Sequence, residues 1–281
     1  MSIHTHQTAP TQFIEAAGIR FAYRRFGKTG EIPLLFNMHF TGTMDHWDPA
    51  VTDGIARERE VILFNNAGIS SSSGEVPPSI YEMARYAEAF VDALGIGKID
   101  VLGLSLGGLV AQQIAIDRPG LVNKLILVGT GPKAGEAMQT LTPEAIEIFS
   151  VKYEVPEELW LKVFFTPSAA SQAAGRKFLD RFRAREQDRD PEVKETVAGA
   201  QVAALNAYNV ITNDRYSDLE KITQPTLVVN GSNDVIIYTI NSYILQQHIS
   251  NAQLILYPDA NHGAPYQYPE LFVQHVNIFL N

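Results

Sequence analysis

The chain has 281 residues, of which 46% are hydrophobic and 19% are charged, proportions that are ordinary for a globular protein with a large core. Its formal net charge of −9 argues against an extended nucleic-acid-binding surface, and no apolar run approaches the roughly 20 residues of a membrane-spanning helix. The absence of cysteine excludes disulfides, thiol catalysis and cysteine-based zinc sites. The polar N-terminus lacks the apolar segment of a signal peptide, so we expect a cytoplasmic protein.

The first half of the chain alternates between strand and helix patterns. Residues 1–10 are polar and are expected to form a loose tail. Short alternating segments on either side of Gly18 favour a hairpin, and continuous apolar runs predict the buried strands that follow. Apolar residues at helical spacing predict a helix over residues 79–94, and a short helix should follow Pro49. The predicted strands of this half are residues 13–17, 19–26, 32–38, 60–64, 99–102 and 122–128.

Between residues 129 and 217 the strand patterns stop and helical patterns take over. Strand and helix then alternate again up to the end of the chain. The predicted helices of the middle part are residues 143–151, 156–165, 168–185 and 191–211; after them come strands at 225–230 and 253–257 and helices at 239–248 and 269–280.

This order of elements predicts the architecture. Strands that alternate with helices form mostly parallel sheets covered on both faces, so we expect an α/β fold with eight strands. Residues 1–133 and 215–281 would form the core. Residues 134–214 would form an inserted helical cap over the carboxyl ends of the strands, where such sheets bind ligands.

A serine stands at the sharpest predicted turn of the chain. Residues 99–102 form a strand pattern, the sequence Gly103-Leu104-Ser105-Leu106-Gly107 follows, and an apolar helix pattern begins at once. This succession is typical of a nucleophile elbow, which strains the serine backbone and lifts its hydroxyl above the sheet. Glycine at both ends of the motif lets strand and helix pass closely. The alternative is that Ser105 merely caps the helix, and this segment alone does not decide between the two.

Two further groups follow later strands. A serine hydroxyl needs a base that takes its proton and a third group that orients the base. Asp234 lies just after the strand at 225–230, and His262 just after the strand at 253–257. Both therefore lie at the same edge of the sheet as Ser105. Asp259 is a rival acid, but its position three residues before His262 favours a structural role.

These motifs resemble the three catalytic signatures of the α/β-hydrolase superfamily, in the same chain order of serine, aspartate and histidine. The resemblance covers residues 13–280, with residues 129–217 at the place of the family's variable helical cap. It is closest to small cap-bearing esterases, lactonases, metal-free haloperoxidase-like enzymes and C–C bond hydrolases. It implies that Ser105 attacks a carbonyl, that His262 takes the proton and later activates water, and that Asp234 fixes the tautomer of the imidazole.

The resemblance also implies an oxyanion hole made of two backbone N–H groups. One is that of Leu106, directly after the nucleophile. The other comes from the loop after the third strand, where the family usually has His-Gly and this chain has His39-Phe40. The second donor is therefore Phe40 or Thr41, and we prefer Thr41. Relatives also usually have aspartate and glycine where this chain has Asn65 and Ser70, a difference that should affect the shape of the pocket.

Aromatic residues and a histidine are candidates for contact with the substrate. Ligand pockets are mostly apolar, so a medium-sized apolar acyl or lactone substrate would fit among them. The cap residues in the set could instead pack the cap onto the core. The candidates are His39, Trp47, Phe149, Trp160 and Phe164.

Together these features predict a cofactor-free serine hydrolase that cleaves a carboxylic ester or lactone through an acyl-enzyme on Ser105. No His, Asp or Glu cluster has metal-ligand spacing, and no Gly-x-Gly-x-x-Gly motif follows the first strand of a βαβ unit, so we expect neither metal nor cofactor. The open alternatives are a C–C bond hydrolase, a metal-free perhydrolase or haloperoxidase, and a ligand receptor of hydrolase fold. The expected partner is a small molecule, not a nucleic acid or a membrane; nothing in the sequence indicates the oligomeric state.

Overall fold

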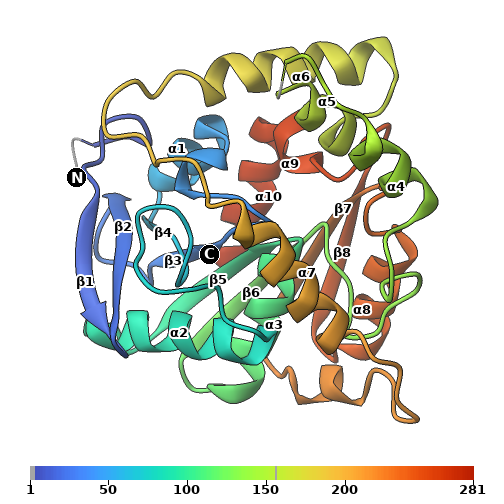
Figure 1. Cartoon of the computed structure of the whole chain (residues 1–281). Coiled ribbons are helices and arrows are strands. Elements are labelled where there is room, and N and C mark those ends of the chain that lie inside the picture. The colour runs from blue at the N-terminus through green and yellow to red at the C-terminus, as the bar shows by residue number, and fades with distance from the viewer. Residues whose placement is uncertain (1–3, 156) are drawn as a thin grey trace.

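An eight-stranded sheet runs through the centre of the molecule (Figure 1). It is seen in a computed structural model that describes residues 4–155 and 157–281. The strand order is β1-β2-β4-β3-β5-β6-β7-β8, in which the first two pairs are antiparallel and the others parallel, as expected. The strands are β1 (Gln12–Ala16), β2 (Ile19–Gly27), β3 (Leu34–Asn37), β4 (Glu60–Phe64), β5 (Ile99–Leu104), β6 (Val122–Val128), β7 (Thr226–Gly231) and β8 (Ala252–Tyr257).

Helices cover both faces of this sheet. Helices α2, α3 and α8 pack on one face, and α1 and α10 pack on the other. Within the described residues, no helix is long and apolar enough to cross a membrane. The elements of the two faces and their connections are η1 (Met44–His46), α1 (Pro49–Ala56), α2 (Ile80–Ala93), α3 (Leu106–Asp117), η2 (Ser217–Lys221), α8 (Ile240–His248), α9 (Ala264–Gln267) and α10 (Pro269–Leu280).

The inner strands supply two separate cores. On β3, Leu34 and Phe36 pack towards α1 and α10, whereas Leu35 packs towards α2 and α3. All three side chains are fully buried. Because successive side chains of a strand point to opposite faces, a strand covered on both faces must be apolar throughout. The continuous apolar run that predicted β3 has this physical cause.

Four α-helices and the 3-10 helix η2 lie between β6 and β7 in the described residues, and we call residues 129–155 and 157–225 the helical insertion. Pro156, in the segment expected to start the second helix, lies outside the described residues. The fourth helix is shorter than the expected residues 191–211, because the backbone at Asp190 and Pro191 is bonded to the side chains of Asp45 and Ser70 instead of continuing into a helix. The helices are α4 (Pro143–Ser150), α5 (Glu158–Phe164), α6 (Ala169–Phe182) and α7 (Thr196–Tyr208).

The N-terminal segment is packed against the rest of the protein. His6 is 1% exposed and Ala9 is fully buried. The Arg185 guanidinium donates hydrogen bonds to the His6 carbonyl at 2.7 Å and to the Ala9 carbonyl at 2.9 Å. For residues 4–10 the expectation of a loose tail is therefore wrong, because backbone carbonyls of this segment satisfy a buried arginine. Residues 1–3 lie outside the described part.

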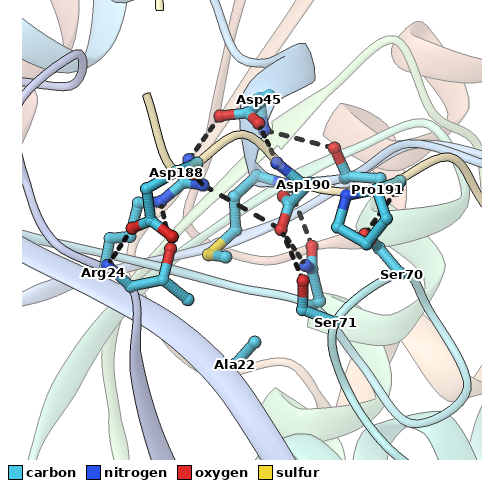
Figure 2. Close-up of polar contacts among 12 residues, drawn as sticks. Ala22, Arg24, Asp45, Ser70, Ser71, Asp188, Asp190 and Pro191 are labelled. Atoms are coloured by element: carbon cyan, nitrogen blue, oxygen red, sulfur yellow. Dashed lines mark hydrogen bonds and ion pairs between the residues drawn. The ribbon is translucent and has the colours of Figure 1, made fainter. Parts of the chain in front are cut away.

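A buried ion pair joins the helical insertion to the sheet. The Arg24 guanidinium on β2 pairs with the Asp45 carboxylate and donates to the Asp188 carbonyl at 2.8 Å. The other Asp45 oxygen accepts the Asp190 N–H at 2.6 Å. Figure 2 shows how these contacts bring the segment that leads to α7 onto the core, where Ser70 and Ser71 donate to it as well. The segment that leads to α7 is thus held in large part by a buried charge pair, since the Arg24 and Asp45 side chains are 0% and 5% exposed.

We expect Arg24→Met to lower the free energy of unfolding by about 3–5 kcal/mol, because it removes the guanidinium that binds the buried Asp45 carboxylate directly and leaves it only Arg185, at 3.7 Å. Arg25→Met, on the next residue of β2, is the matched control. Its ion pair with Glu60 at 2.8 Å is partly exposed, so its loss should cost about 1 kcal/mol or less. Urea denaturation of both variants measures the difference, and equal losses would contradict this account.

Candidate active site

The candidate nucleophile lies at a strained turn between β5 and α3. Ser105 has φ 57° and ψ −120°, a conformation that costs free energy for a residue with a side chain. Neither flanking glycine has room for a Cβ atom. One on Gly103 would lie 2.2 Å from the Gly107 carbonyl oxygen, and one on Gly107 would lie 2.1 Å from that of Asn37. Only glycine at both positions lets β3, β5 and α3 meet this closely, as the elbow interpretation requires.

His262 and Asp234 form a buried pair at the ends of the last two strands. The His262 Nδ1 atom lies 2.8 Å from Asp234 Oδ2, and the two side chains are 3% and 0% exposed. The other Asp234 oxygen accepts the N–H groups of Ile236 at 2.9 Å and Ile237 at 3.0 Å. The carboxylate is therefore fixed on one side by backbone and free on the other to accept the Nδ1 proton. This tautomer leaves Nε2 of His262 as a proton acceptor.

Ser105 and His262 both border the end of β6. The Ser105 N–H donates to the Val128 carbonyl at 2.9 Å. A Cβ on the next residue, Gly129, would lie 3.3 Å from two atoms of the His262 ring. Within the described residues no hydrogen bond joins the serine hydroxyl to the imidazole.

The loop after β3 lies beside the nucleophile. Phe40 and Leu106 line the same cavity as Ser105. Among the described residues, neither the Phe40 N–H nor the Leu106 N–H has an acceptor. The Thr41 N–H, in contrast, donates to Gln201 Oε1 of α7 at 2.7 Å. The preferred second donor of the sequence analysis, Thr41, is thus already engaged in this structure.

A cavity of about 380 Å³ opens above Ser105. Its walls come from the loop after β3, from the start of α3, from the helical insertion and from the residues after Asp234. As far as the described residues form these walls, none of them is charged. They are Phe40, Ser105, Leu106, Leu109, Ala137, Met138, Thr140, Leu141, Phe149, Val202, Leu205, Asn206, Asn209, Ile236 and Ile237.

The candidate substrate residues are divided between the cavity and the packing around it. Phe149 lines the cavity. His39, Trp160 and Phe164 form an aromatic cluster, with ring centroids 5.4 Å apart in each pair. The Phe164 ring is also parallel to that of His262 at 6.2 Å, so this cluster supports the candidate base. None of the three is among the residues that line the cavity.

Trp47 packs on Phe36 instead of facing the cavity. The two ring centroids are 4.9 Å apart, and Trp47 is 3% exposed. Its place in the core between the sheet and α1 explains its size and apolar character without a ligand. Sequence reasoning missed other residues that do line the cavity, among them Ile236 and Ile237. The sequence feature that could have identified these two residues is their position as an apolar pair in the loop that follows the candidate acid, Asp234.

Asp259 has a structural role in this arrangement. Its carboxylate accepts hydrogen bonds from the Thr166 hydroxyl at 2.6 Å and the Ser168 hydroxyl at 2.5 Å. It thereby joins the loop that carries His262 to the start of α6. Within the described residues, no group of three or more His, Asp or Glu side chains could hold a metal ion.

A sheet of this order with a strained serine turn is the architecture of the α/β-hydrolases. The family described as alpha/beta hydrolase fold matches residues 32–268. A solved structure, an alpha/beta hydrolase fold protein from Chitinophaga pinensis, is 40% identical, covers 99% of both chains and has a TM-score of 0.93. The chain therefore belongs to the α/β-hydrolase family and is an enzyme of that fold.

Several relatives are named for specific activities, and two of them differ in substrate. A pimeloyl-acyl-carrier-protein methyl ester esterase from Nitrosomonas europaea is 27% identical over 87% of this chain and 94% of its own. A 2-hydroxy-6-oxo-6-phenylhexa-2,4-dienoate hydrolase from Burkholderia cepacia is 28% identical over 78% of this chain and 76% of its own. Relatives of similar identity thus differ in the substrates that their names give, and the family alone does not select one activity.

Two buried histidines beside the site make stability depend on pH. Burial lowers the pKa of His46 to about 4 and that of His39 to about 3. In the unfolded chain both take up a proton near pH 6.5, while the folded protein keeps them neutral. Unfolding therefore binds protons below pH 6.5, and stability falls as the pH drops from about 6.5 to about 4. Each histidine contributes a slope of about 1.4 kcal/mol per pH unit.

We expect His46→Gln to remove one histidine's share of this slope. Glutamine can still accept the Thr43 N–H, which lies 2.8 Å from His46 Nδ1. Urea denaturation between pH 8 and pH 4.5 measures how the free energy of unfolding changes with pH. The difference in this free energy between variant and wild type at pH 8 is the baseline. Parallel curves for the variant and the wild type would refute the assignment of a neutral buried His46.

Proposed function

We propose that this enzyme is a cofactor-free serine hydrolase that cleaves a neutral carboxylic ester or lactone through an acyl-enzyme on Ser105. One observation carries the proposal. A strained serine stands at the wall of an apolar cavity, at the same edge of the sheet as a buried His262–Asp234 pair. The proposal also gives residues 134–214 the role of a cap, because this segment supplies much of the cavity wall.

The steps follow from the positions of the groups. Ser105 Oγ attacks the carbonyl carbon while its proton passes to His262 Nε2, and Asp234 stabilises the imidazolium that forms. The tetrahedral intermediate then collapses, the C–O bond to the leaving group breaks, and His262 returns the proton to the departing oxygen. Water attacks the acyl-enzyme next; its proton goes to His262, and the acid leaves as Ser105 regains its hydrogen.

The developing oxyanion requires two N–H donors that are not already bonded. We assign Leu106 N–H and Phe40 N–H to this role. Both residues line the cavity beside Ser105, and both N–H groups lack an acceptor among the described residues. The engagement of the Thr41 N–H with Gln201 argues against Thr41 in this role.

The character of the cavity favours an ester over a dienoate. The name of the relative from Burkholderia cepacia specifies a substrate with a carboxylate. Burying a carboxylate costs several kcal/mol unless a cation or hydrogen-bond donors compensate it. No lysine, arginine or histidine is among the described residues that line the cavity. An uncharged, apolar acyl group therefore fits this cavity better than an anionic one.

Ser105→Ala should abolish turnover of p-nitrophenyl esters, with a loss of roughly a thousandfold or more in kcat and no loss of thermal stability. The assay covers acyl chains from acetate to decanoate, and the optimum length measures the cavity. Activity that survives the substitution would refute the proposed nucleophile. No ester turnover by the folded wild type, together with a large ligand-induced rise in Tm, would instead favour a ligand receptor.

A matched pair of esters tests the uncharged pocket. p-Nitrophenyl hexanoate and the mono-p-nitrophenyl ester of adipic acid differ only in whether the chain ends in a methyl group or a carboxylate. We expect kcat/KM to be roughly 100-fold lower for the acid, because its charge would be buried without a partner. Equal values for the two esters would show that a charged terminus is accommodated.

A further inference from the structure

One hydrogen bond joins the helical insertion to the loop after β3. Gln201 lies on α7 and is 5% exposed. Its Oε1 accepts the N–H of Thr41 at 2.7 Å, across 160 positions of sequence. Thr41 has φ 55°, in the left-handed region that residues with side chains seldom occupy. The buried Gln201 side chain thus accepts a hydrogen bond from the residue whose backbone is strained, Thr41.

The two peptide groups that flank Phe40 are both fixed. In the preceding one, the His39 carbonyl accepts the Gly42 N–H at 3.0 Å. In the following one, the Phe40 carbonyl accepts the His39 Nδ1–H at 2.9 Å and the Thr41 hydroxyl at 2.8 Å. The N–H of that same peptide is the one that Gln201 holds. Gln201 is therefore the one contact in this set that comes from outside the loop.

The helix that carries Gln201 also lines the cavity. Val202, Leu205 and Asn206 of α7 are among its wall residues. The segment that enters α7 is anchored on the core by the Asp45–Asp190 contact at 2.6 Å (Figure 2). One anchored helix therefore touches both the space for the acyl group and the loop that carries the candidate oxyanion donor.

We propose that Gln201 is a positioning residue for the oxyanion site. Its Oε1 holds the Phe40–Thr41 peptide, and this contact keeps the Phe40 N–H directed at the carbonyl oxygen of the bound ester. The inference rests on the proposed serine hydrolase and adds to it a dependence of the oxyanion site on the helical insertion. An acyl group that packs against α7 also stabilises the helix that holds this donor.

The size of the effect follows from the role of the donor. Removal of one oxyanion donor in comparable sites lowers kcat by roughly 10²–10³-fold. Loss of the group that positions a donor leaves the donor present but less well directed. We therefore expect Gln201→Met, which keeps the length of the side chain but has no acceptor oxygen, to lower kcat by about 10–100-fold. KM should change by less than about threefold, because the cavity wall is retained.

A pair of ketones separates this role from a purely structural one. An alkyl trifluoromethyl ketone accepts Ser105 Oγ at its carbonyl carbon; the serine proton passes to His262, and the new oxyanion occupies the site of the two N–H groups. The methyl ketone of the same chain fills the cavity without this step. Gln201→Met should weaken the binding of the trifluoromethyl ketone by about 10–100-fold, in parallel with the loss in kcat. The affinity for the methyl ketone should be nearly unchanged.

Two further variants complete the experiment. Gln201→Asn keeps the amide but shortens the reach to Thr41, so it should show the same loss; it replaces Gln201→Met if that variant fails to fold. Gln247→Leu, at an exposed glutamine of α8, is the matched control and should behave as the wild type. Thermal unfolding confirms that each variant is folded.

The contrary results are distinct. Gln201 only shapes the cavity if KM rises and the methyl ketone binds more weakly, while kcat and the ratio of the two ketone affinities stay unchanged. If nothing changes in a folded variant, the contact has no role in turnover. Either result overturns the inference while Ser105-dependent turnover stands. Turnover that is independent of Ser105 would instead remove the proposed function on which the inference rests.

Discussion

The close approach of β3, β5 and α3 at Ser105 is the constraint on which the rest of the site depends. A Cβ on Gly107 would overlap the Asn37 carbonyl at 2.1 Å, so the start of α3 lies directly on the end of β3. This contact gives Ser105 its φ of 57° and brings the loop after β3 beside it. The candidate nucleophile, the Leu106 N–H and the Phe40 N–H thus come from one packed junction. Because the sheet is parallel there, the strand ends that precede Asp234 and His262 lie at the same edge.

The helical insertion is attached to this core by buried polar contacts. The resemblance to the family led us to expect aspartate at position 65, and the environment of Asn65 gives a reason for the amide. Its Oδ1 accepts the Met44 N–H at 2.9 Å, while its Nδ2 donates to Asp190 at 2.9 Å. An aspartate would place a third carboxylate beside Asp45 and Asp190, where the Arg24 and Arg185 guanidinium groups are the nearby cations. The amide instead supplies the donor that Asp190 requires, and like-charge repulsion is avoided.

Sequence patterns predicted the elements whose cause is local or periodic. Glycine spacing around Ser105 predicted the turn, since the crowding there allows no side chain at Gly103 or Gly107. The apolar runs predicted the strands. The walls of the cavity were only partly predictable. The sequence does not distinguish an apolar residue that packs in the core, as Trp47 does on Phe36, from one that faces a ligand. The Gln201–Thr41 bond, which joins residues 160 positions apart, has no signature along the chain.

The most direct test of the central claim is the site of acylation. The wild-type enzyme is mixed with p-nitrophenyl hexanoate, quenched in acid within the first turnovers, and analysed by intact and peptide mass spectrometry. The account predicts a hexanoyl group on the peptide that contains Ser105, in amounts that match the initial burst of p-nitrophenol, and none in Ser105→Ala. A burst with the acyl group on another residue, or steady turnover with no acylated protein under any quench time, would contradict it.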